Sequence, residues 1–339
     1  MIDEAERLTD EALAALEKRI ARIYREARDA LEAQAQEYFR KFIKRDEEMR
    51  EMLEAGDITE ADYRDWRLTQ IARGQRFTAL RDQCADRLVH VNETAAAYVN
   101  DTTPTLMSLG HNYAAYELEN LGHELNIGID FTLWNEQTVR RLITEMPDLL
   151  PPAKIDIPKD QLWNRNKITN EITAAIIRGE RVSKIAARMR DVTDANEAAA
   201  RRTARTALTN AQNAGRQDTY TAAAKMGIKS RKRWVSAHDA RVRHSHAMLD
   251  GQTVAIDAPF VSSLGSRMMH PGDWSLGAVG ADIYNCRCAM RTVEKDGIEA
   301  EPRMMRVRDP ETGRNVIVNA ATYSDWMRAQ GRDAFGNQG

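Results

Sequence analysis

The sequence has little cysteine, little proline and few aromatic residues. Its 339 residues include 3 cysteines and 9 prolines, and Phe, Trp and Tyr together make up 6%. Three cysteines are too few for the disulfide framework of a small secreted domain, and a bridge between Cys286 and Cys288, two positions apart, would be strained. We therefore expect synthesis in a reducing cytoplasm and a fold stabilised by a hydrophobic core.

Long apolar runs and nucleotide-binding motifs are also absent. No stretch of about 18 apolar residues occurs, so we expect no membrane span, and the acidic residues 1–4 do not resemble a secretory signal. The chain contains no P-loop and no G-x-G-x-x-G, which argues against a bound nucleotide. Charged residues make up 29% but leave a net charge of only -2, which excludes a protein that coats nucleic acid with bulk positive charge.

Most of the chain has the patterns of helices. Residues 9–53 contain no glycine or proline, and apolar residues recur there every three or four positions, which predicts one long amphipathic helix or two nearly continuous ones. Further helices are predicted over about 75–99 and 104–121, with Pro104 marking the break between them. Another is predicted over about 195–226, where Gly215 indicates a close contact with a neighbouring element.

The character of the chain changes at two places. Four prolines fall between residues 147 and 158, and each fixes φ and removes a donor, so this segment is either a linker or a loop inside one domain. After Gly227 the pattern turns to short strands, at about 231–236, 252–256 and 287–293, separated by glycine-rich loops. We therefore predict a mainly α N-terminal helical region followed by a small, loop-rich α+β C-terminal domain. The predicted parts are a helical N-terminal domain (1–146), a Pro-rich linker (147–160), a second helical part (161–227), an α+β core that carries the motifs (228–295) and a C-terminal tail (296–339), whose glycine-rich end is expected to fray.

Residues 234–288 hold most of the chemically distinctive side chains. Four of the 7 histidines and two of the 3 cysteines fall there. Two thiolates and two imidazoles suit tetrahedral zinc, so His246, His270, Cys286 and Cys288 are the candidate metal ligands. The C-x-C spacing differs from the usual zinc knuckle, and the alternative is that the histidines hydrogen-bond within loops while the cysteines fill a small core.

The same window supplies the residue types of a hydrolase triad in Asp239, Ser245 and His246. The sequence has no nucleophile elbow such as G-x-S-x-G, and Asp239 can instead pair with Arg241 or Arg243 to fix the loop. A zinc-dependent hydrolase, a nuclease or a toxin-like enzyme is the alternative function that these residues leave open.

A basic cluster lies at the start of the predicted α+β core, formed by Lys229, Arg231, Lys232 and Arg233. Such a patch could face DNA and bind its phosphate backbone independently of sequence and with strong salt dependence. No helix-turn-helix, zinc-finger spacing or aromatic stacking platform accompanies the cluster, so the alternative is an ordinary solvated face.

An ordered set of motifs resembles a known family. A helix with A-R-T-A-L-T-N-A-Q-N-A-G-R (204–216) precedes R-W-V-S-A-H-D-A-R-V-R-H-S-H-A-M-L-D-G-Q (233–252), then H-P-G-D (270–273) and N-C-R-C (285–288). Over about residues 168–292 this set resembles the phage head morphogenesis family, the Mu F-like minor head proteins of tailed bacteriophages. The family pattern places His-Pro just before N-C-R-C, whereas residues 272–284 separate the two here.

The resemblance implies a structural virion protein rather than an enzyme. Its implied partners are the portal protein and capsid or scaffold proteins during procapsid assembly, with a role in DNA packaging or ejection and non-specific contact with packaged double-stranded DNA. Its implied place is the capsid interior or the portal vertex, and zinc is the one cofactor suggested. The motif positions carried over from the family are expected to form a polar network that orders the core: Arg205, Asn213, Gly215, Trp234, Asp239, Arg241, Arg243, Gly251, Asn285 and Arg287, beside the four candidate metal ligands.

Overall fold

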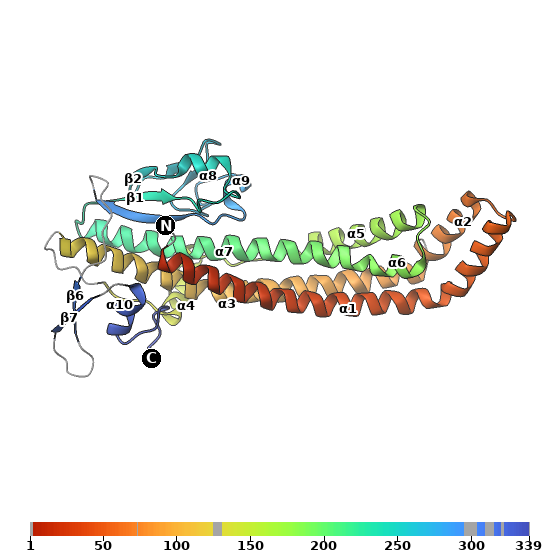
Figure 1. Ribbon diagram of the computed structural model, residues 1–339, viewed down its shortest axis with the longest axis horizontal. Coiled ribbons are helices and arrows are strands. Elements are labelled where there is room, and N and C mark those ends of the chain that lie inside the picture. Colours follow the sequence, from red (N-terminus) through yellow and green to blue (C-terminus); the bar gives the residue numbers. More distant parts are fainter. Residues whose placement is uncertain are drawn as a thin grey trace. The chain divides into compact units, whose positions relative to one another are not determined.

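A computed structural model describes residues 3–72, 74–124, 131–294, 304–308, 315–319 and 322–338. Long helices dominate, and a few short strands follow them in the chain (Figure 1). The helical elements are α1 (Glu4–Ala55), α2 (Glu60–Arg67), the π-helix η1 (Leu68–Ala72), α3 (Gln75–Glu124), α4 (Glu136–Glu145), the 3-10 helix η2 (Pro147–Leu149), α5 (Ile157–Ile177), α6 (Val182–Ala187), α7 (Met189–Lys225), α8 (His244–Leu249), α9 (Gly280–Ile283) and α10 (Tyr323–Ala329). The strands are β1 (Ser230–Val235), β2 (Thr253–Ala255), β3 (Phe260–Val261), β4 (Arg267–Met268), β5 (Ala289–Glu294), β6 (Met304–Arg308) and β7 (Asn315–Asn319). The predicted fold class is confirmed.

The described helices lack a membrane-spanning candidate, since none combines sufficient length with sufficient apolar content.

Helix α1 is a single helix of 52 residues, so the first of the two predicted alternatives is confirmed. It ends before Gly56, whose φ of 82° is a left-handed conformation that glycine adopts without strain. Helix α2 then begins with a capping box, in which the Thr59 hydroxyl accepts from the Asp62 N–H and the Asp62 carboxylate accepts from the Thr59 N–H. Local sequence signals therefore set this stop and this start.

Helix α3 runs without interruption through Pro104, so the predicted break there is wrong. A proline inside a helix costs about 3 kcal/mol because it removes a hydrogen bond and its ring crowds the preceding turn. Here the Thr103 hydroxyl donates to the carbonyl of Asn100 at 3.3 Å. Residues 106–109 are fully buried in the turn that follows, and this burial offsets the cost of the proline.

The proline-rich segment is partly a fixed loop. The Asn100 side chain on α3 makes two hydrogen bonds with the backbone of Ala153, donating to its carbonyl at 3.0 Å and accepting from its N–H at 2.7 Å. Helix α5 follows with Asp156 as its cap and Pro158 in its first turn, where a missing N–H leaves no helical hydrogen bond unmade.

The chain forms two compact units, each assembled from separated stretches. The long-helix unit comprises residues 17–98 and 154–201, and the sheet unit comprises residues 1–16, 99–153 and 202–339. These units are defined by packing between segments far apart in the sequence, whereas the parts predicted above follow the chain in order.

The long-helix unit has a core with the spacing of amphipathic helices. Its buried side chains recur every three or four residues along α1, α3 and α5, as the periodicity of the sequence predicts. The core residues are Ala27, Leu31, Ala35, Phe39, Phe77, Leu80, Cys84, Ala85, Leu88, Ile168, Ile172, Ala175, Ile176, Val182, Ile185, Ala186, Met189 and Val192.

The end of the chain is packed within the sheet unit. The ring centroid of Tyr323 on α10 lies 5.1 Å from that of Tyr113, and the Trp326 indole donates to Glu119 at 3.0 Å. Beyond α10, the carbonyl of Phe335 accepts a hydrogen bond from the Ser108 hydroxyl at 3.1 Å. The expected fraying is therefore wrong for the described residues up to 338, because buried aromatic rings and these hydrogen bonds hold the end on α3.

Helices α3 and α7 approach each other closely within the sheet unit, and two glycines permit it. A Cβ on Gly110 would lie 1.9 Å from the carbonyl oxygen of Gln212, and one on Gly215 would lie 2.1 Å from that of Met107. The Thr219 hydroxyl donates to the carbonyl of His111 at 3.0 Å across the same contact. The prediction that Gly215 marks a close contact is confirmed.

Candidate functional site

The motif-bearing core is built on a three-stranded antiparallel sheet with the order β2-β1-β5. Side chains alternate along β1, so Lys232 and Trp234 are buried on one face while Arg231 and Arg233 lie on the other. Gly251 makes the tight turn before β2, with a φ of 77°, and its N–H donates to the carbonyl of Trp234 at 2.9 Å. The Asp-Gly turn fixes where β2 joins β1.

One face of helix α7 lines the free edge of β5 and the residues before it. Figure 1 shows the C-terminal part of α7 running alongside the small sheet. The hydrogen bonds are Thr209 Oγ1 to Cys286 O (2.9 Å), Asn213 Nδ2 to Cys288 O (3.1 Å), Met290 N to Asn213 Oδ1 (3.2 Å) and one Arg216 guanidinium N–H to Met290 O (2.8 Å). Polar side chains of a helix therefore satisfy backbone groups that a neighbouring strand would otherwise satisfy.

The spacing of these side chains along α7 matches the spacing of the backbone groups along residues 286–290 for a geometric reason. Every second residue of a strand presents its backbone groups to the same side, and two strand residues advance about 6.6 Å. On the helix, the four residues from 209 to 213 advance about 6 Å and the three from 213 to 216 about 4.5 Å, so these side chains can reach 286, 288 and 290 in turn. Covering the strand edge in this way also removes a site for edge-to-edge aggregation. Two motifs that are far apart in the sequence, 204–216 on α7 and N-C-R-C at 285–288, therefore meet because the first forms a helix face and the second leads into the strand edge that this face covers.

Asn285 turns the chain into the segment 286–290 that hydrogen-bonds to α7. Its φ of 61° is left-handed, a conformation that asparagine tolerates better than most residues. Its N–H donates to the Thr206 hydroxyl at 2.8 Å, and its side-chain oxygen accepts from Arg205 at 2.8 Å. Both partners lie on α7, so the helix also fixes the backbone immediately before Cys286.

Three of the four candidate metal ligands come together in the core. His246 on α8 places Nδ1 3.3 Å from the Sγ of Cys288 and 3.7 Å from the Sγ of Cys286. The three ligand atoms lie within 4.8 Å of one another, and all three residues are buried. The Trp234 ring packs edge-on against the imidazole, with centroids 5.5 Å apart, and walls the group on one side.

This donor set fits zinc. Tetrahedral bonds of about 2.0–2.1 Å to nitrogen and 2.3 Å to sulfur would place N and S about 3.6 Å apart, close to the two distances here. The thiols are electrostatically unlike, since the hydrogen bond between them lowers the pKa of Cys286 and raises that of Cys288. A metal ion would bind both sulfur atoms as thiolates.

A buried carboxylate that the motifs did not single out faces the other side of the histidine. Oδ1 of Asp282 on α9 lies 3.6 Å from Nε2 of His246 and accepts from the Ser245 hydroxyl at 2.7 Å. Burial alone would raise the pKa of Asp282, but hydrogen bonds from Ser262, Ser266 and Ser245 together lower it. Asp282 lies on the short helix α9, in a segment with no recognisable motif, so no signal in the sequence points to it.

His270 is not part of the metal group. It is buried elsewhere in the core, with Nδ1 3.1 Å from the carbonyl of Pro271, and burial lowers its pKa. The carbonyl of His270 accepts from the N–H of Asp273, so the H-P-G-D motif closes on itself as a turn. The insertion between this turn and N-C-R-C is long enough for the two motifs to occupy separate positions. Among the described residues, His246, Cys286 and Cys288 form the one group that could hold a metal ion.

The triad residue types do not assemble. The Asp239 carboxylate makes two hydrogen bonds with the Arg287 guanidinium, one of them 2.7 Å long, and this pairing lowers the pKa of Asp239. Ser245 donates to Asp282 rather than to His246. The predicted pairing of Asp239 with Arg241 is confirmed, since the Arg241 guanidinium lies 3.7 Å from the carboxylate and the Arg241 backbone N–H donates to it at 2.9 Å. Arg287 is a closer partner that was not predicted.

Arg243 instead donates to the carbonyl of Tyr284, immediately before the N-C-R-C motif. Like Arg287, it therefore serves to fix the loop around the cysteines.

One member of the basic cluster does not face solvent. Lys232 is fully buried, and its ammonium donates to Gln217 at 2.8 Å and to the carbonyl of Met269 at 2.7 Å. Burial lowers its pKa to about 8. Its assignment as a DNA-facing residue is wrong, because β1 alternation turns it inward. Lys229 and Arg231 are exposed and Arg233 is half-buried.

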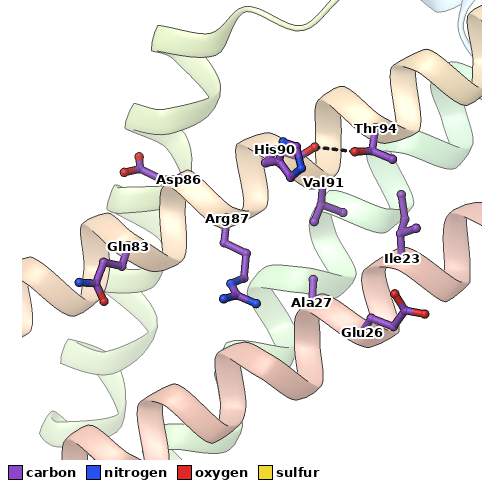
Figure 2. Close-up of a pocket in the computed structure, with 9 residues that line it drawn as sticks. All are labelled: Ile23, Glu26, Ala27, Gln83, Asp86, Arg87, His90, Val91 and Thr94. Atoms are coloured by element: carbon purple, nitrogen blue, oxygen red, sulfur yellow. Dashed lines mark hydrogen bonds between the residues drawn. The ribbon is translucent and has the colours of Figure 1, made fainter.

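A groove of about 660 Å³ lies far along the chain from the motifs, in the long-helix unit. It is lined by α1 and α3, and Figure 2 shows Arg87 of α3 pointing towards α1, with apolar Val91 and Ala27 to one side of it. Its described walls bring together no cluster of metal ligands.

This core, in which α7 covers the edge of a small sheet and the chain carries H-S-H and N-C-R-C, lies within a segment that is similar to phage head morphogenesis proteins, a class of virion components. Residues 166–291 match the family of Phage Mu protein F like proteins, which confirms the family that the motifs indicated. Over 331 residues the chain is 25% identical to the Minor head protein GP7 of Bacillus phage SPP1, and the match covers 96% of both chains. Both matches support a head morphogenesis role.

A second relative has an enzymatic name. The chain is 28% identical over 258 residues to the NAD(+)--arginine ADP-ribosyltransferase EFV of Enterococcus faecalis, a match that covers 71% of this chain and 49% of that protein. The chain thus spans about half the length of this relative. No solved structure matches the chain.

Proposed function

We propose that the chain is a minor capsid protein that associates with the portal during procapsid assembly and acts in DNA packaging or ejection. The observation that carries this proposal is the end-to-end match with a minor head protein, which includes the helical regions outside the family domain. We place the protein at the capsid interior or the portal vertex, where exposed Lys229 and Arg231 can contact packaged DNA through its phosphates. Capsid or scaffold proteins are further proposed partners.

Co-expression with the portal protein of the same phage tests this function. We expect the two proteins to co-elute from an affinity column on either tag and to run together on size exclusion. The portal of an unrelated phage is the control and should not be retained. Separate elution of the two proteins at micromolar concentration would contradict the proposed association.

We further propose that the chain acts without catalysis. Ser245 and Asp239, which a hydrolase would need beside His246, are engaged by Asp282 and Arg287. The similarity to a transferase covers about half of that protein, so transferase activity does not follow from it. Transfer of ADP-ribose from NAD+ to arginine by the purified chain would contradict this proposal.

We propose a structural zinc ion as the one cofactor, held by His246, Cys286 and Cys288. The fit of the donor atoms and their complete burial support it. Bound metal stabilises the folded state, so removal of zinc by a chelator should lower the melting temperature of the sheet unit by roughly 5–10 °C. Scanning calorimetry before and after chelation, with metal analysis of both samples, measures this.

Cysteine variants provide the matched control. Cys286→Ser and Cys288→Ser should each lose the metal, whereas Cys84→Ala should retain it, because Cys84 is buried in the core of the long-helix unit. A purified protein without zinc, whose melting is also unchanged by added zinc, would refute the metal centre.

A further inference from the structure

We propose that Asp282 is the positioning residue of the metal centre, which fixes His246 so that Nδ1 is the ligand atom. This inference rests on the zinc site proposed above and adds a residue outside the ligand set. It concerns the orientation and tautomer of one imidazole ring.

The two ring nitrogens of His246 face different partners. Nδ1 points to the two thiols at 3.3 and 3.7 Å, whereas Nε2 faces the Asp282 carboxylate at 3.6 Å. Nε2 is buried and has no hydrogen-bond partner at normal distance. A shift of the ring by roughly 0.5 Å would bring Nε2 to about 3.0 Å from the carboxylate, the usual length of such a bond.

A neutral imidazole carries one N–H and one lone pair, and it binds a metal through the nitrogen that lacks the proton. A carboxylate beside Nε2 favours the proton on that nitrogen, which leaves the lone pair of Nδ1 directed at the thiols. Carboxylates that accept from a metal-bound histidine commonly act in this way, by fixing the ring and its tautomer.

The carboxylate can do this because it is itself held rigidly. Its Oδ1 accepts from the Ser245 hydroxyl at 2.7 Å, and its Oδ2 accepts from the Ser262 hydroxyl at 2.6 Å. Asp282 is fully buried, and both serines are also buried. Ser266 also hydrogen-bonds to this carboxylate. A carboxylate has about four acceptor sites, so one remains available for Nε2.

Asp282→Asn in the full chain tests the inference, because asparagine keeps the shape but can present an N–H to Nε2. We expect the affinity for zinc, measured by competition with a chromogenic chelator, to fall about 10- to 100-fold. Nitrogen-15 NMR of labelled histidine should show His246 with Nε2 protonated in the wild type and a larger population of the other tautomer in the variant.

The chain provides a matched control in Asp273, a second buried carboxylate beside a histidine. Asp273 accepts backbone N–H bonds from Met269 and Ser275 and lies near His270, outside the metal group. Asp273→Asn should leave zinc affinity and the His246 spectrum unchanged. If Asp282→Asn does not fold, Ser262→Ala loosens the carboxylate without touching His246 and should lower affinity by a few-fold.

The outcomes separate the two proposals. A wild type that binds no zinc refutes the metal centre itself. A wild type that binds zinc, with Asp282→Asn binding equally well through the same nitrogen, refutes the role of Asp282 alone. A fall in affinity of the same size in Asp273→Asn would also overturn it, because the effect would then be a general loss of core order.

Discussion

Replacing Arg216 with methionine should remove about 3–5 kcal/mol from the free energy of unfolding of the sheet unit, because it leaves buried carboxylates without their partner. Arg216 is fully buried, donates to Asp3 at 2.7 Å and to the carbonyl of Met290 at 2.8 Å, and lies 3.7 Å from Glu117. Its guanidinium also stacks 4.6 Å from the ring centroid of Tyr113. One side chain of α7 thus joins α3, β5 and Asp3, the residue before α1.

The stability lost on replacing Arg216 should depend on pH, and the protonation of Glu117 determines whether the loss grows or shrinks as pH rises. Burial raises the pKa of Glu117 to about 7, although Arg216 pulls it down. The folded protein therefore keeps a proton on Glu117 above pH 4.5, its ordinary pKa, and the stability this contributes is lost as pH rises through about 7. At pH 5 Glu117 is neutral, so removal of Arg216 leaves no unpaired charge on Glu117. At pH 8 Glu117 is ionised and would be left unpaired, so Arg216→Met should cost less stability at pH 5 than at pH 8.

Urea denaturation at both pH values, followed by tryptophan fluorescence and circular dichroism, measures this effect. Arg328→Met is the control, because Arg328 pairs with Asp325 at the surface of the same unit with its side chain 75% exposed. An exposed pair contributes about 0–1 kcal/mol. Equal losses in the two variants would show that the buried charge cluster does not stabilise the unit.

Alanine at Gly110 or Gly215 should destabilise the same unit by about 3 kcal/mol or more, in the upper range for overpacked cores. In an ordinary helix, alanine is more favourable than glycine by about 1 kcal/mol, so the sign is reversed here. The added Cβ would meet backbone atoms, namely the carbonyl of Gln212 at 1.9 Å or that of Met107 at 2.1 Å. Backbone cannot rotate away as a side chain can, so the helices must separate.

The double variant makes the test sharper. Because both glycines serve one crossing, helices already separated by the first alanine should accept the second at little cost, and Gly110→Ala with Gly215→Ala should lose far less than the sum. Gly74→Ala is the control, since its Cβ would meet nothing closer than 3.5 Å. Additive losses, or a single variant as stable as the wild type, would rule out the close crossing.

The elements that the sequence predicted well are those whose causes are local. The single helix α1, the end of α7 before Gly227 and the strand β1 follow from periodicity and from glycine at left-handed φ. The break expected at Pro104 was wrong because burial of the following turn outweighs a local preference.

The site shows the same division. The ordered motifs indicated the family and placed His246, Cys286 and Cys288 together, since their residue types suit a metal. His270 and Lys232 were assigned wrongly, one because an insertion turns the H-P-G-D motif away and the other because strand alternation buries it.

The sequence by itself determined the helical character of the chain, the stops and caps of its helices, and its similarity to head morphogenesis proteins. Only the tertiary structure decided that α7 serves as the missing neighbour of β5, that Asp282 faces His246, and that two glycines let α3 meet α7. The physical reason is that caps and periodicity act over a few residues. Hydrogen bonds between a helix face and a strand edge, or contacts between two backbones, join positions about which the intervening sequence carries no signal.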